Sequence, residues 1–86
     1  MNKVYGVLLT ELGWNDLEYA LRGYYREGDG GKYIYCSKVE PDGPFFVMHA
    51  SRTNDDGSKF DAEISIPHHY VKFVICGAEE KQLGFS

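Results

Sequence analysis

Residues 60–66 read Phe60-Asp61-Ala62-Glu63-Ile64-Ser65-Ile66, an alternation of apolar and polar side chains. Successive side chains of a β-strand point to opposite faces of a sheet, so this period of two predicts a half-buried strand. Its apolar positions, beginning with Phe60 and ending with Ile66, should face the core. Pro67 ends the strand because proline has no backbone N–H to donate to a ladder.

On either side of this stretch, the chain contains four further segments typical of strands. Residues 3–10, 32–39, 45–51 and 70–76 are rich in β-branched and aromatic side chains. The turns expected at residues 40–43 and 53–58 contain proline, glycine, asparagine and aspartate, which favour chain reversal. Short connections make antiparallel neighbours. Residues 3–10 are apolar on both faces, which predicts a place inside the sheet.

Residues 15–22 fit two descriptions. Asn15 and Glu18 have the spacing of a helix N-cap and its reciprocal carboxylate, and Gly23 could end the helix. Leu17, Ala20, Leu21 and Tyr24 would then form one helical face. The same segment also alternates as a strand would, so a strand stays open as the alternative. Residues 26–31 contain three glycines and are expected to form a loop.

These elements together predict a single, mainly β domain over residues 1–77, followed by a tail at residues 78–86. We expect a small antiparallel five-stranded sheet, curled into a barrel-like fold with one short helix. The alternative is an open α+β sheet covered by the helix, because so few strands need curling or a helix to bury a core.

One segment carries a family resemblance. Ile66-Pro67-His68-His69-Tyr70-Val71 resembles the turn that joins the last two strands of Src-homology-three domains. That resemblance implies a strongly bent barrel, with Pro67 and Tyr70 lining a groove for proline-rich peptides. The family's alanine-leucine-tyrosine-aspartate box and its tryptophan pair are missing, and Phe45-Phe46 is a poor substitute for that pair.

Charge and cysteine content bear on partners and location. The chain has a net charge of −4 and no basic run, which argues against nucleic-acid and membrane partners. The apolar N-terminal run is broken early by Glu11, so a signal peptide is not expected and the cytoplasm is the predicted location. Without secretion, Cys36 and Cys76 are expected to be free thiols, with a disulfide as the alternative.

Catalytic and metal-binding signals are weak. His68 and His69 are adjacent, so in a strand they would point to opposite faces and could not easily share a metal. A site combining His49, one of these histidines and Cys76 can be drawn, but no ligand spacing demands it. The sequence contains no recognisable calcium loop, phosphate loop or activated nucleophile. We therefore predict no catalytic residue, cofactor or metal, and a non-enzymatic function is favoured.

Aromatic residues are the least ordinary feature. The 86 residues include seven tyrosines, five phenylalanines and one tryptophan, more rings than so small a core can hide. The predicted interaction surface consists of Tyr24, Tyr25, Tyr33, Tyr35, Phe45, Pro67 and Tyr70. This pattern favours a protein-interaction or self-association module, with a homodimer expected. The alternatives are a small-ligand binder or enzyme with a site near His49 between sheet and helix, and, less favoured, a single-stranded nucleic-acid binder.

Overall fold

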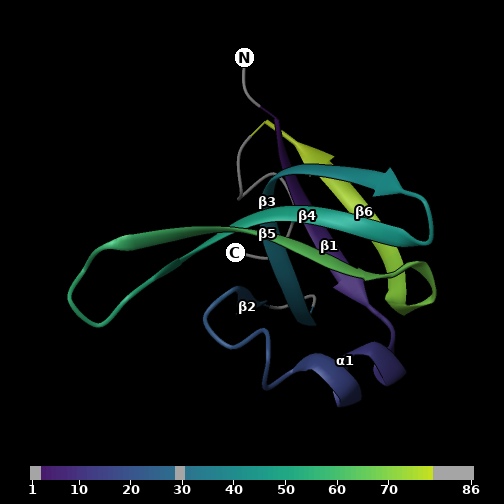
Figure 1. Cartoon of the computed structure of the whole chain (residues 1–86), viewed down its shortest axis with the longest axis horizontal. Coiled ribbons are helices and arrows are strands. Elements are labelled where there is room, and N and C mark those ends of the chain that lie inside the picture. The colour runs from purple at the N-terminus through teal and green to yellow at the C-terminus, as the bar shows by residue number, and fades with distance from the viewer. Residues whose placement is uncertain (1–2, 29–30, 79–86) are drawn as a thin grey trace.

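The computed structural model describes residues 3–28 and 31–78. Over these ranges the chain is mainly β, with one short α-helix and one turn of 3-10 helix (Figure 1). The elements, in chain order, are β1 (Val4–Leu9), α1 (Glu11–Leu17), β2 (Tyr25–Gly28), β3 (Gly31–Asp42), β4 (Phe45–Thr53), β5 (Lys59–Pro67), η1 (His68–Tyr70) and β6 (Val71–Gly77). All strand pairs are antiparallel, which confirms the predicted class.

The six described strands form one sheet in the order β5-β4-β3-β1-β6, with β2 also paired to β3. Ile34 in β3 has Val7 of β1 as its partner on one side and Tyr25 of β2 on the other. The register shifts between Cys36 and Lys38, where β3 leaves β2 and pairs with β4. Such a bulge bends and twists a strand, which lets the sheet curl around its core. Within the described residues β5 and β6 are not neighbours, so the sheet stays open.

The main core lies on the inner face of the curled sheet. Its fully buried side chains come from β1, β3 and β4, with Val7, Ile34 and Met48 at its centre. A smaller cluster of Leu8 and Tyr33 lies on the opposite face of the sheet. Val7 and Leu8 of β1 belong to different clusters, and β1 lies between β3 and β6, inside the sheet as its apolar faces predict.

Helix α1 begins and ends earlier than expected. Thr10 caps it, and its Oγ1 accepts a hydrogen bond from the backbone N–H of Gly13 at 3.0 Å. The predicted helix over residues 15–22 is wrong in its limits, because residues 18–24 form turns instead. The helix starts earlier because Gly13 packs directly against Tyr70. A Cβ at Gly13 would lie 3.0 Å from the Cβ and from the carbonyl oxygen of Tyr70. Only a glycine lets the helix dock this closely on η1.

Two predicted loops are partly strand. Residues 26–28 belong to β2 and Gly31 belongs to β3. These two strands pair as a β-hairpin where the sequence predicts a loop. Residues 29–30 lie outside the described residues, as does the expected tail except for residue 78. The turn expected at residues 40–43 lies at residues 43–44 instead, because β3 pairs with β4 as far as Asp42. Gly43 has a φ of +60°, a conformation that favours glycine and explains where the chain reverses.

Strand β5 confirms the predicted alternation only in part. Ile66 is buried, and Ala62 and Ile64 are half-buried against the core. Phe60 is 50% exposed, which corrects the expectation that it faces the core. Phe60 pairs with Arg52 near the turn of the β4–β5 hairpin, and in Figure 1 this hairpin extends beyond the rest of the sheet.

The two cysteines are free in the structure. Cys36 of β3 and Cys76 of β6 both have Tyr5 of β1 as a partner, one on each side. Two strand spacings, roughly 10 Å, therefore separate them, which is too far for a disulfide.

Candidate functional site

The predicted aromatic surface is divided among several parts of the molecule. Tyr24 lies in the main core and Tyr33 in the smaller cluster, so both are buried where exposure was expected. Tyr35 packs beside Tyr33, half-buried. Tyr25 contacts Trp14 edge to face, with ring centroids 5.3 Å apart. These four tyrosines do not form one continuous exposed face.

The other three predicted residues come from the corner where β4 begins and β5 ends. Phe45 and Pro67 are cross-strand partners, and Phe45 is 46% exposed. Tyr70 follows in η1, and its hydroxyl donates a hydrogen bond to the carboxylate of Asp16 in α1. This bond raises the pKa of Tyr70, because ionisation of the phenol would lose the hydrogen bond and place two negative charges together. Tyr70 thereby connects helix α1 to the segment that follows β5.

The strands at the two ends of the sheet order, β5 and β6, differ in how they are protected. On β5, Lys59, Asp61 and Glu63 are exposed charged side chains. On β6, Lys72 is the one charged residue, and Phe73 and Val74 are 43% and 36% exposed. Charges on an outer strand discourage pairing with other chains, so β5, with three exposed charges, is better protected by its own side chains than β6, with one. We refer to the outer side of Val71–Gly77 as the β6 edge.

His49 lies among polar side chains on the outer face of the sheet. Its Nε2 is 3.8 Å from a carboxylate oxygen of Glu40, and Lys38 lies 3.8 Å from the same carboxylate group. A shallow depression of about 510 Å³ beside it is lined by polar residues such as Ser51 and Asp61. Ser51 donates its hydroxyl hydrogen to the carboxylate of Asp61, its cross-strand partner. Among the described residues, no three His, Cys, Asp or Glu side chains gather as metal ligands.

Several cations lie over aromatic rings, a feature that sequence reasoning missed. The guanidinium carbon of Arg22 is 4.9 Å from the ring centroid of Tyr19. That of Arg52 is 5.6 Å from Tyr24 and 5.5 Å from Phe60. Arg22 and Tyr19 belong to one turn, whereas Arg52 reaches Tyr24 only because the sheet folds β4 against the segment after α1.

No family model matches this chain, and neither a curated protein nor a solved structure matches it. In the described part of the chain, no helix has the length and apolar character needed to cross a bilayer.

Proposed function

We propose that this chain is a non-enzymatic protein-interaction module that self-associates through the β6 edge. The observation that carries the proposal is the contrast between the outer strands, of which β5 is charged and β6 is apolar. An outer strand presents unpaired backbone N–H and C=O groups, and natural proteins blunt such strands with charge, proline or a cover. Within Val71–Gly77 there is no proline and a single lysine.

A second copy of the chain is the partner that this edge fits. Antiparallel pairing of β6 with β6 about Val74 creates an isologous, two-fold interface, the commonest kind in homo-oligomers. Phe73 of each copy then lies opposite Ile75 of the other, an aromatic and β-branched pair of the sort that stabilises sheets. Lys72 lies opposite Cys76, so the arrangement places no like charges face to face.

The sheet's outer face would continue across such an interface. The register of β1 with β6 places Phe73 opposite Leu8, and Ile75 belongs to the same apolar cluster as Leu8 and Tyr33. A dimer would bring two of these clusters side by side. Burial of the exposed part of Phe73 and Val74 then adds apolar stabilisation to the backbone hydrogen bonds.

We also propose that the chain folds as a bent barrel like that of Src-homology-three domains. Its support is the position of residues 66–71, which lead from β5 through η1 into β6, the last two strands. A second candidate function, binding of proline-rich peptides, is favoured by the pairing of exposed Phe45 with Pro67. Titration of the chain with a proline-rich peptide should then perturb the amides of Phe45 and its neighbours, and Phe45→Ala should abolish binding.

The self-association proposal is tested by light scattering coupled to size-exclusion chromatography over a concentration series. The unaltered chain should shift from monomer to dimer as concentration rises. Val74→Lys and Phe73→Lys place a charge on the β6 edge and should keep the chain monomeric. Ser65→Lys places the same charge on exposed β5 and is the matched control, which should still dimerise.

Hydrogen exchange locates the interface independently of these variants. Amides on the β6 edge should become protected at dimer-forming concentrations, while amides of the β4–β5 turn should not change. A chain that stays monomeric at every concentration, or a dimer that Val74→Lys and Phe73→Lys leave intact, would overturn the proposal.

A further inference from the structure

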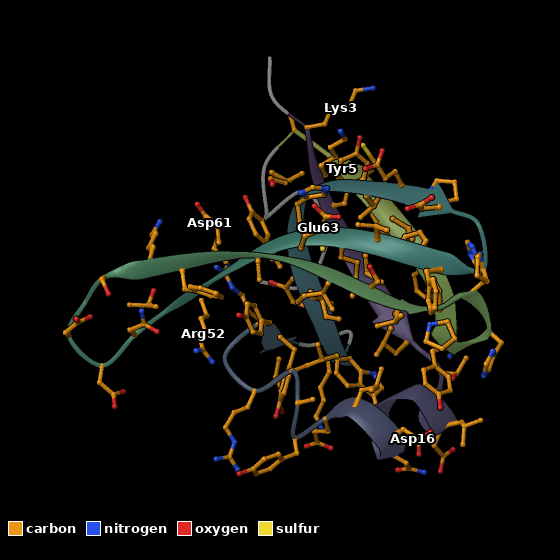
Figure 2. All side chains as sticks on the ribbon, in the orientation of Figure 1. Lys3, Tyr5, Asp16, Arg52, Asp61 and Glu63 are labelled. Atoms are coloured by element: carbon orange, nitrogen blue, oxygen red, sulfur yellow. The ribbon has the colours of Figure 1, made fainter. Side chains whose placement is uncertain are left out.

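A depression of about 400 Å³ lies between the turn after α1 and the base of the β4–β5 turn. Its lining residues are Arg22, Gly23, Arg52, Thr53, Asn54 and Asp55. Figure 2 shows Arg52 projecting from β4 on the side of the sheet where α1 lies. This depression is separate from the β6 edge, so an inference from it does not depend on the proposed dimer.

The backbone at Gly23 approaches Arg52 closely. Gly23 has a φ of +90°, which side chains other than hydrogen rarely tolerate. A Cβ added there would lie 3.6 Å from the Cβ and Cδ of Arg52. Gly23, the residue after Arg22, therefore packs against the aliphatic stem of Arg52, and both arginines line the depression.

Neither Arg22 nor Arg52 forms an ion pair with any residue in the described ranges. Their guanidinium groups lie over aromatic rings, Arg22 over Tyr19 and Arg52 over Tyr24 and Phe60. A ring restrains a guanidinium but does not neutralise its charge. Both groups therefore keep their capacity to bind an anion, and their positions are partly set before it arrives.

The local charge is positive although the chain as a whole is acidic. Asp55 is the one carboxylate among the lining residues, against two arginines. Glu18, which lines an adjoining depression with Arg22, is held by Lys32 at 2.8 Å, and this contact lowers the pKa of Glu18. Opposing charges beyond roughly 10 Å are largely screened at ordinary salt concentrations, so the net charge of −4 does not decide binding here.

We infer that this depression binds the phosphate group of a nucleotide. Arginine presents planar, bidentate donors that match phosphate oxygens, and the hydroxyl of Thr53 adds a neutral donor. The side-chain amide of Asn54 donates one hydrogen to Ser58, which leaves its second N–H for the phosphate. Tyr19 beside Arg22 is 81% exposed, and Phe60 beside Arg52 is half exposed. Exposed rings next to a phosphate site are suited to stacking of a base. A free mononucleotide and one unit of a single strand present the same chemistry.

The test is a titration of the full isotope-labelled chain, followed by amide chemical shifts. The probes are adenosine monophosphate, inorganic phosphate and a short single-stranded oligonucleotide. We expect both nucleotide probes to shift the amides of Gly23 and Asn54, and phosphate alone to bind at least about tenfold more weakly, because it lacks the stacked base. Tighter binding of the oligonucleotide than of the mononucleotide would identify the source as a single strand.

Three variants separate the site from general electrostatics. Arg22→Gln should weaken nucleotide binding about tenfold, the value of one charge-assisted contact. Tyr19→Ala, at a highly exposed position, should remove the advantage of nucleotide over phosphate without affecting the fold. Lys38→Gln removes the same charge on the outer face and should leave binding unchanged. Absence of binding, equal binding of phosphate and nucleotide, or equal losses in Arg22→Gln and Lys38→Gln would each overturn the inference.

Discussion

Titration of the Cys36 thiol should reveal how completely the core excludes water. Cys36 has no exposed surface, and its sulfur lies 3.5 Å from the carbonyl oxygen of Ile34. Burial raises the pKa of this thiol to about 12, because the thiolate cannot be solvated among apolar neighbours. In the unfolded chain the same thiol should ionise near its ordinary value of 9.0.

The sign of the pH effect follows from these two values. Below pH 9 the thiol is neutral in both states, so it adds no pH dependence. Between pH 9 and pH 12 only the unfolded chain loses the proton, and the free energy of unfolding falls as pH rises. One pKa unit corresponds to about 1.4 kcal/mol, so the loss between pH 8 and pH 10 should be about 1.4 kcal/mol.

Urea unfolding at pH 8, 9 and 10 measures this loss, with Cys36→Ala as the comparison. The alanine variant is less stable throughout because it leaves a cavity, but it lacks the thiol and should show a shallower pH dependence. Tyrosine and lysine ionisations are common to both chains and cancel in the difference. Cys76→Ala at the exposed cysteine should keep the steeper dependence. Parallel curves for the unaltered chain and Cys36→Ala would refute the reasoning.

Three further predictions concern the fold and its helix contact. Gly13→Ala should destabilise the chain by about 1–3 kcal/mol in urea unfolding, because the added Cβ would lie 3.0 Å from Tyr70. Asn15→Ala, on the exposed side of α1, is the control and should be nearly neutral. Asp16→Asn should lower the pKa of Tyr70 in an ultraviolet titration; an unchanged pKa would show that the hydrogen bond does not form in solution. Met48→Ala should cost about 2–5 kcal/mol, since Met48 is fully buried, and a loss below 1 kcal/mol would contradict its place in the core.

The sequence predicts the fold of this chain better than it predicts the candidate sites. Phe45, Pro67 and Tyr70 do come from one corner of the sheet, but Tyr24 and Tyr33 were expected outside and are buried. A tyrosine in a strand has no local feature that distinguishes a core ring from a surface ring. The sequence also contained Arg22 and Arg52, yet thirty positions separate them, and only the fold places both around one depression.

The sequence alone determined that the chain is mainly β, that most turns lie near glycine and proline, and that β1 is covered on both faces. These features follow from side-chain period and backbone preference, which act between residues close in the chain. The tertiary structure decided where α1 begins, because Gly13 packs on Tyr70, fifty-seven positions away. It also decided that β5 and β6 lie at the two ends of the sheet order, because strand order depends on which distant segments pair.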